Sequence, residues 1–280
     1  MKQKSLSMLI VGLLLAVGCS KNNGSTGSTA TVASTTSLPC LSLMVPAYFY
    51  PTQPTSPWNT VIADAPWNAK VARTMILNPN SGPGTAVDPT YQATVAAVHK
   101  AGGKLYGYVP TGYGADAMAT VETEIQEYIS WYGVDGIFLD EASEDASMVS
   151  PYYQPLATYI TSRIPGGGVI LNPGVYPDAS YAAIAVPVSS TLRIVVFEHD
   201  YATFTSSSSV LEPTWAAGYP PSMFINIVYD TSAANVANVL TVSIARNVDA
   251  VYVTDQTLPN PYAVLPSYWS TLTQSTQAGC

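Results

Sequence analysis

The sequence predicts a single (β/α)8 barrel, and three observations lead to this fold class. Eight short apolar segments rich in β-forming residues recur at similar intervals after residue 40. Helical or turn-rich segments separate them, and each apolar run is continuous rather than alternating, which is typical of parallel strands covered by helices. Eight strand-then-helix units of this size close most naturally into a barrel.

The elements follow one another along the chain in a regular order. The expected strands cover residues 41–50, 73–77, 104–109, 136–140, 168–171, 192–197, 223–229 and 250–254. Asp88 followed by Pro89 predicts a helix start, because an N-cap is followed by proline at the first helical position. A second apolar stripe begins at Val121, Pro151 opens a third helix, and Thr231 or Ser232 caps a fourth. Only a short helix is expected in the long connection after the sixth strand.

An open, doubly wound sheet is the alternative fold. Such a sheet is expected to carry a glycine-rich phosphate turn after its first strand. Pro51-Thr52-Gln53-Pro54 stands at that place and has no glycine. The barrel is therefore the preferred prediction.

Composition limits the partners of the folded part. Charged residues make up 10% of the chain, whereas tyrosine alone occurs 19 times, and the formal net charge is −8. There is no basic cluster, and an acidic surface repels nucleic acid. We expect no nucleic-acid partner and no cofactor, and we expect a monomer.

The N-terminus predicts export from the cytoplasm. Lys2 and Lys4 precede an apolar run too short to span a bilayer, so residues 1–18 are expected to be a signal peptide. The residues before Cys19 also resemble a bacterial lipobox, which implies that Cys19 is acylated and anchors the protein to a membrane. An ordinary secreted protein is the alternative. The protein is expected in the cell envelope or outside the cell.

A flexible tether and a possible disulfide define the rest of the chain ends. Residues 19–39 are mostly small and polar, which predicts a tether, and residues 40–280 form the folded domain. Cys40 begins this domain and Cys280 ends the chain, so in an oxidising compartment the pair is expected to form a disulfide. Two unpaired thiols are the alternative.

The expected strand ends carry carboxylates, amides and aromatic rings. Asp140 and Glu141 end the fourth strand and Glu198 follows the sixth, and in a barrel such ends meet at one mouth, where active sites lie. A pair of carboxyl groups across a mouth is the equipment of a glycosidase. Taken alone, the Asp-Glu pair could equally cap a helix. Other strand-end side chains are candidates for binding sugar: Tyr48, Tyr108, Asn172, Asn226, Tyr229 and Asp255.

The same residues resemble a known family. The Phe-Leu-Asp-Glu end of strand four, the Val-Phe-Glu end of strand six and the opening Val-Pro-Ala-Tyr-Phe-Tyr-Pro look like the spherulin-4-like family, over about residues 42–269. Its characterised members fall in glycoside hydrolase family 135. The resemblance implies a (β/α)8 barrel with Asp140, Glu141 and Glu198 as its acidic trio. It also implies endo-acting hydrolysis of the α-1,4-linked N-acetylgalactosamine of exopolysaccharides such as galactosaminogalactan.

Strand geometry separates the roles within this trio. Neighbouring residues of a strand point to opposite faces, so only one of Asp140 and Glu141 is expected to face the cleft. We expect Asp140 to act as nucleophile or charge stabiliser, Glu198 as general acid and base, and Glu141 as a supporting residue, by likeness to related α-galactosaminidase barrels. Glu141 as the acid is the alternative.

Two functions of other classes are also compatible with the sequence. The barrel could bind a polysaccharide without cleaving it, as a surface adhesin. A divalent-metal phosphoesterase is the second, with ligands drawn from five neighbouring acids and imidazoles: Asp140, Glu141, Glu198, His199 and Asp200.

Overall fold

The computed structural model describes residues 40–52, 54–64, 73–206 and 212–278, and in them the predicted barrel is confirmed. Eight parallel strands pair in sequence order and the eighth pairs with the first, which closes the sheet. They are β1 (Ser42–Ala47), β2 (Arg73–Leu77), β3 (Lys104–Pro110), β4 (Gly136–Asp140), β5 (Gly168–Leu171), β6 (Thr191–Asp200), β7 (Phe224–Tyr229) and β8 (Ala250–Val253). The expected signal peptide, the tether, Cys19 and Cys280 lie outside the described residues.

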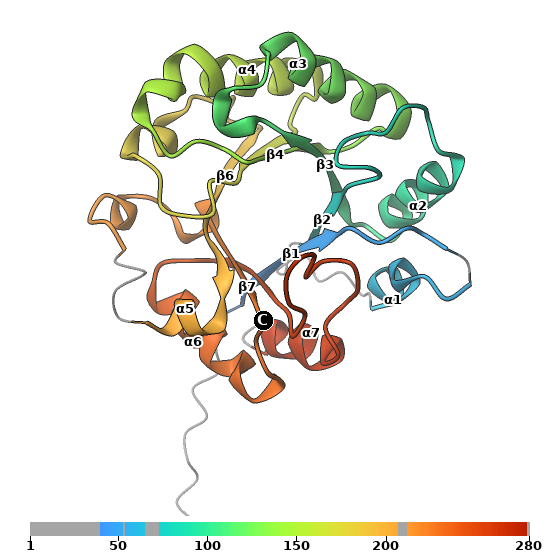
Figure 1. Ribbon diagram of the computed structural model, residues 1–280, viewed down its shortest axis with the longest axis vertical. Helices are drawn as coiled ribbons and strands as arrows, with labels where there is room; N and C mark the ends of the chain where they lie inside the picture. Colours follow the sequence, from blue (N-terminus) through green and yellow to red (C-terminus); the bar gives the residue numbers. More distant parts are fainter. Residues whose placement is uncertain (1–39, 53, 65–72, 207–211, 279–280) are drawn as a thin grey trace, which may run out of the picture. The chain divides into compact units, whose positions relative to one another are not determined.

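The helices lie outside the ring of strands (Figure 1). They are α1 (Pro57–Ala63), α2 (Pro89–Lys100), α3 (Met118–Glu127), α4 (Gln154–Arg163), α5 (Tyr201–Thr205), α6 (Val236–Ala245) and α7 (Trp269–Gln277). The cap predicted for α2 is confirmed, because the Asp88 carboxylate accepts a hydrogen bond from the Thr90 amide at 2.7 Å. None of the helices in the described ranges combines the length and the apolar character needed to cross a bilayer.

Several connections differ from the prediction. A π-helical turn, Val149–Tyr153, precedes α4, so this helix begins at Gln154 and not at Pro151. Between β5 and β6, where no particular helix is predicted, the described chain forms a 3-10 helix, Ala179–Ala183. A 3-10 turn, Ala233–Asn235, precedes α6; Ser232 stands at the N-cap position of that turn, but its side chain makes no capping hydrogen bond. Such local changes of helix type leave no clear mark in the apolar pattern.

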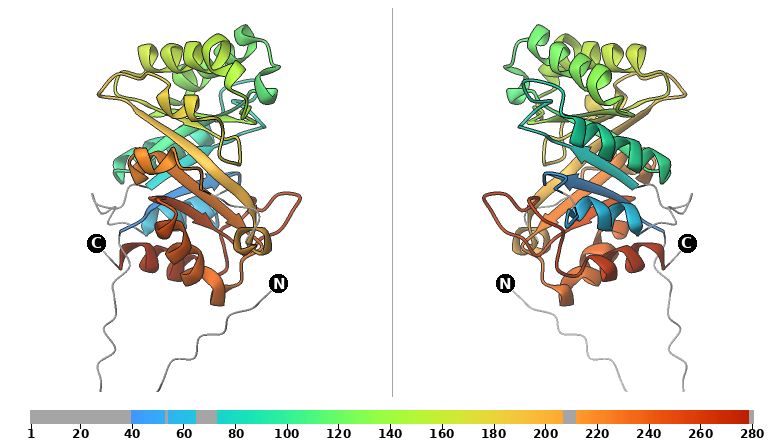
Figure 2. Two further views of the ribbon diagram at one scale, coloured as in Figure 1. Left: turned by 90° about the vertical axis from the view of Figure 1, so that its left-hand side faces the viewer. Right: turned by 90° about the vertical axis from the view of Figure 1, so that its right-hand side faces the viewer.

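Strand β6 is longer than predicted. It continues through Asp200, three residues beyond the expected end, and runs obliquely across the barrel wall (Figure 2). Its last four residues pair with β7 up to the partners Asp200 and Tyr229. Glu198 therefore belongs to a hydrogen-bonded strand and not to a loop, which fixes its backbone.

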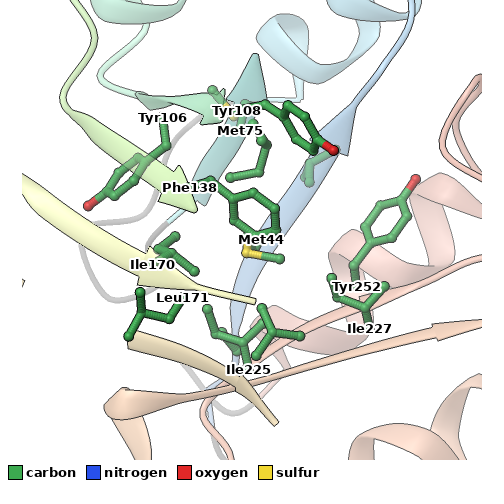
Figure 3. Close-up of a cluster of buried hydrophobic side chains, with 14 of the residues drawn as sticks. Met44, Met75, Tyr106, Tyr108, Phe138, Ile170, Leu171, Ile225, Ile227 and Tyr252 are labelled. Atoms are coloured by element: carbon green, nitrogen blue, oxygen red, sulfur yellow. The ribbon is translucent and has the colours of Figure 1, made fainter. Parts of the chain in front are cut away.

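The barrel interior is filled by apolar side chains from several strands. Met44, Phe138, Ile170 and Ile225 point toward one another there (Figure 3), and each is at most 1% exposed. Closer to the N-terminal ends of the strands, Tyr106 takes the space that two glycines leave. A Cβ atom at Gly168 would lie 1.9 Å from the Tyr106 hydroxyl, and one at Gly136 would lie 2.4 Å from its ring. The pockets that Glu198 lines open at the opposite, C-terminal mouth.

The two ends of the folded domain meet beside β1. The Leu41 amide donates to the carbonyl of Thr276 in α7 at 3.1 Å, next to Cys40, which is disulfide-bonded. Because Cys280 lies outside the described residues, its pairing with Cys40 stays a prediction.

Candidate active site

Two neighbouring pockets open at the C-terminal ends of the strands. The first, about 580 Å³, is lined by Asp140, Glu141, Asn172 and Tyr176 among others, and the second, about 490 Å³, by Tyr48, Tyr108, Tyr229 and Tyr262 among others. Glu198 lines both, so the pockets meet at its carboxylate. In the described residues no lysine or arginine lines either pocket. Each is of the size that binds small organic ligands, and together they form a cleft centred on Glu198.

A single amide group joins the two main carboxylates. Asn172, which follows β5, donates from Nδ2 to Asp140 Oδ1 and to Glu198 Oε2, both at 2.6 Å. The Gly174 amide donates to Asn172 Oδ1 at 3.0 Å, which fixes the orientation of the side-chain amide with its NH2 group toward the acids. Since both oxygens lie 2.6 Å from the same nitrogen, they are at most twice that distance, about 5.2 Å, apart.

A β-bulge directs Glu198 into the barrel. Val195 pairs with Ile225 and Glu198 with Ile227, so β6 uses three steps where β7 uses two, and the register shifts between Val195 and Phe197. In a regular strand without a bulge, Glu198 lies three residues from the inward side chain of Val195 and would point outward. Instead Phe197 faces outward and packs on Phe204 of α5, with ring centroids 5.0 Å apart. The bulge therefore creates the carboxylate pair.

The structure links Asp140, rather than Glu141, to Glu198 through the Asn172 amide. Asp140 ends β4 and joins the Asn172 amide, whereas Glu141 is exposed at the rim of the first pocket and has a left-handed backbone, with φ of 49°. Thr111, fully buried, fixes this turn because its hydroxyl lies 2.9 Å from the Asp140 carbonyl and 2.8 Å from that of Glu141. Both acids therefore line the first pocket, contrary to the expectation that only one faces the cleft, but Asp140 is the one that joins the Asn172 amide.

The two carboxyl groups have unequal surroundings. Burial raises the pKa of Asp140, while hydrogen bonds from Tyr108, Asn172 and the backbone of Glu141 act to lower it. Burial likewise raises the pKa of Glu198, and the nearby charge of Asp140 raises it further, against hydrogen bonds from Tyr262 and Asn172. Asp140 has more donors and Glu198 carries the repulsion, so Glu198 is the group of the pair whose protonated form is favoured and Asp140 the one whose ionised form is favoured.

The second pocket is walled by tyrosines. The rings of Tyr48 and Tyr108 meet edge to face with centroids 5.5 Å apart, and the Tyr108 hydroxyl donates to Asp140. Tyr229 stacks on His199 at 5.8 Å. Three of the predicted substrate-binding residues, Tyr48, Tyr108 and Tyr229, therefore line this pocket, and Asn172 lines the other.

Two predicted binding residues lie elsewhere, and those predictions are wrong. Asn226 is buried on the outer face of β7, where it donates to Ser243 of α6 at 3.0 Å, because it lies an odd number of residues from the inward Tyr229. Asp255 lines neither pocket and accepts from the Ser267 amide at 3.1 Å. It closes the loop between β8 and α7 rather than facing a ligand.

The same loop supplies a residue that sequence reasoning missed. Tyr262 lies in the middle of the connection from β8 to α7, and its hydroxyl donates to Glu198 Oε1 at 2.5 Å. Its distance in sequence from any strand end gave no signal for a place in the site. A second missed residue, Tyr113, is 66% exposed at the rim of the first pocket.

The residues considered for a divalent metal do not converge. Asp200 accepts from the Thr203 amide at 2.8 Å as the cap of α5, and it contacts His199 at 2.7 Å. One oxygen of Asp140 and one of Glu198 each accept a hydrogen bond from the Asn172 amide. Across the described ranges no three acidic, histidine or cysteine side chains are placed to hold a metal ion. The arrangement suits proton transfer better than cation binding.

Fold and site together define a (β/α)8 barrel with a carboxylate pair in a cleft at the C-terminal mouth. The chain belongs to the spherulation-specific family 4, whose sequence pattern it matches over residues 42–276. The family resemblance is thereby confirmed.

Two relatives illustrate this similarity. The chain is 34% identical to Spherulin-4 of Physarum polycephalum over 234 aligned residues, which cover 80% of this chain and 66% of that protein. It therefore spans slightly less than two thirds of that relative. Among solved structures, the barrel resembles Aspergillus clavatus Sph3 in complex with GalNAc, with a TM-score of 0.71 and 24% identity over 85% of this chain and 98% of that one. This second likeness concerns the fold.

Proposed function

We propose that the protein is an endo-acting glycoside hydrolase that cleaves internal bonds of an α-1,4-linked N-acetylgalactosamine or galactosamine polysaccharide. The observation that carries the proposal is the pair of half-buried carboxyl groups, Asp140 and Glu198, held on one amide where two pockets meet. Paired carboxyl groups across a sugar-sized cleft are the equipment of glycoside hydrolysis.

The unequal surroundings of the acids support distinct roles. Glu198, which holds its proton, donates it to the glycosidic oxygen as the bond from that oxygen to the anomeric carbon breaks. The ionised Asp140 forms a new bond to the same carbon, which gives a covalent glycosyl-enzyme. Glu198 then takes a proton from water, the water oxygen attacks the anomeric carbon, and Asp140 leaves. Both acids return to their starting state.

The separation of the acids favours this double displacement. Their nearer oxygens are at most about 5.2 Å apart, since both contact Asn172 Nδ2 at 2.6 Å. Retaining glycosidases have carboxyl groups about 5 to 5.5 Å apart, whereas inverting enzymes need about 6.5 to 9.5 Å to admit a water molecule. The product is therefore expected to keep the anomeric configuration of the substrate.

The lining of the cleft supports a polymeric, neutral or cationic sugar. Tyrosine rings offer flat faces for sugar rings, and Asn78, Asn80 and Asn260 can bond hydroxyl groups as donors and acceptors. Because the pockets extend on both sides of Glu198, a chain can continue past the cleaved bond in both directions. The link to galactosamine rests on family membership and on the GalNAc bound by Sph3.

Product analysis tests the proposal. The protein is incubated with α-1,4-linked galactosamine polymers of known acetylation, new reducing ends are counted, and product sizes are read by mass spectrometry. We expect oligosaccharides of several lengths from the wild type and almost none from Glu198→Gln. Binding of the polymer without new reducing ends would instead support a polysaccharide-binding surface protein.

Lipid anchoring at Cys19 and a disulfide between Cys40 and Cys280 complete the proposal. An anchored hydrolase would act on polymer at the cell surface. Labelling with a fatty acid should mark the wild type and not Cys19→Ser, and peptide mapping under non-reducing conditions should recover Cys40 joined to Cys280. A fatty-acid label that persists in Cys19→Ser would contradict the lipid anchor. Recovery of Cys40 and Cys280 in separate peptides would contradict the disulfide.

A further inference from the structure

The loop between β8 and α7, residues 254–268, reaches back over the barrel mouth and is fixed at both ends. Near its start, Asp255 accepts from the Ser267 amide at 3.1 Å, and the Gln256 carbonyl accepts from the Asp230 amide at 2.9 Å. At its end, the Tyr268 hydroxyl donates to the Thr231 carbonyl at 2.8 Å. These bonds join the loop to itself and to the chain after β7, so its middle is held in place.

Tyr262 occupies that middle and is locked between two other rings. Its ring meets those of Tyr48 and Tyr252 edge to face, with centroids 5.4 Å and 6.2 Å apart. The side chain is 7% exposed, and its backbone amide donates to Asn260 at 3.1 Å. The hydroxyl can therefore not rotate far from Glu198 Oε1, 2.5 Å away.

We propose that Tyr262 is a positioning residue that holds Glu198 in its working orientation and strengthens it as an acid. The inference rests on the proposed function. Asn172 already contacts Oε2, so the phenol on Oε1 completes a two-sided clamp on the carboxyl group. A hydrogen bond from a phenol stabilises the carboxylate that forms when Glu198 gives up its proton. Tyr262 does not touch the reacting sugar atoms in this account.

The effect is separable from those of the other groups that face Glu198. Six titratable groups surround Glu198, at or near the ends of the strands and in the loop: Asp140, Tyr48, Tyr108, Tyr229, Tyr262 and the adjacent His199. Of these, Asp140 raises the pKa of Glu198 by its charge, whereas Tyr262 lowers it by its hydrogen bond. Removing the Tyr262 hydroxyl should therefore raise that pKa.

Tyr262→Phe tests the inference, because phenylalanine keeps the ring packing and removes the hydroxyl. We expect kcat on the polymer to fall roughly 10- to 100-fold, the loss of one hydrogen bond to a charged group. The basic limb of the kcat/KM profile should move up by roughly one pH unit. Tyr252→Phe is the matched control, since it trims the neighbouring ring without contacting either acid, and it should change neither quantity.

A second readout does not depend on turnover. In protein labelled with ¹³C at glutamate, the Glu198 carboxyl signal is identified by its absence from Glu198→Gln and titrated in the wild type and in Tyr262→Phe. An upward shift in the variant supports the inference, and an unchanged titration overturns it, even if kcat falls. If the wild type cleaves no polymer, the proposed function fails, and this titration still decides the role of Tyr262.

Discussion

Replacing Glu198 with glutamine should stabilise the folded protein in a pH-dependent way. The nearer oxygens of Asp140 and Glu198 lie within about 5.2 Å, since both contact Asn172 Nδ2 at 2.6 Å. Two full charges at that distance repel by about 3 kcal/mol at an effective dielectric constant of 20. Glutamine removes one charge and still offers an oxygen to Asn172 and an amide to Tyr262. We therefore expect the free energy of unfolding to rise by about 1 to 3 kcal/mol at pH 8.

The sign follows from the raised pKa of Glu198, which burial and the charge of Asp140 lift above its ordinary value of 4.5. Between the unfolded and folded pKa values the folded protein binds more protons, so the wild type loses stability as the pH rises through that window. Below the unfolded pKa both forms are protonated and the advantage of Glu198→Gln should vanish.

Urea unfolding at pH 4 and pH 8 measures this difference. Glu141→Gln is the control, because this rim residue lies outside the amide-linked pair, and we expect it to change stability by less than about 0.5 kcal/mol at both pH values. An equal effect of Glu198→Gln at the two pH values, or destabilisation at pH 8, would refute a buried like-charge pair.

Three further substitutions test other parts of the account. Asp140→Asn should lower kcat at least about 1,000-fold, while the affinity for oligosaccharide, measured by calorimetry, stays within about tenfold of the wild type. Comparable losses of kcat and of affinity would argue against Asp140 as the nucleophile. Thr111→Val removes the hydroxyl that lies near the carbonyls of Asp140 and Glu141, so it should cost about 1 to 3 kcal/mol in urea unfolding and also lower kcat. Gly107→Ala would place a Cβ atom 2.4 Å from the Tyr128 ring, so we expect a loss of stability above about 2 kcal/mol; a neutral result would contradict the packing of Tyr128, in the π-helical turn after α3, on β3.

The barrel and the main acids could be predicted because parallel strands bring their C-terminal ends to one mouth. Continuous apolar runs marked the strands, so Asp140, Asn172 and Glu198 were placed at neighbouring strand ends without knowledge of any contact. Strand alternation does not account for the direction of Glu141, which lies beyond β4 in a left-handed turn. The same alternation, applied to Asn226 and Tyr229, would have shown that they face opposite sides of β7.

The remaining features depend on geometry that the sequence does not display. The bulge in β6 turns Glu198 inward, although simple alternation from Val195 predicts the opposite. Tyr262 reaches the site from the middle of a long loop, and the bonds that hold this loop, such as Asp255 to Ser267, are visible only after folding. Asp255 was misread for the same reason, since a carboxylate after a strand end can serve either the cleft or the loop.

The anomeric form of the first product tests whether Asp140 and Glu198 act as a retaining glycosidase pair. Proton NMR of a polymer digest, recorded before mutarotation interconverts the anomers, shows which anomer each new reducing end carries. We expect the α anomer from an α-linked polymer, because the oxygens of Asp140 and Glu198 that share the Asn172 amide are at most about 5.2 Å apart, less than the separation of an inverting pair. Release of the β anomer would contradict Asp140 as nucleophile, and the absence of any new reducing end would contradict glycoside hydrolysis itself.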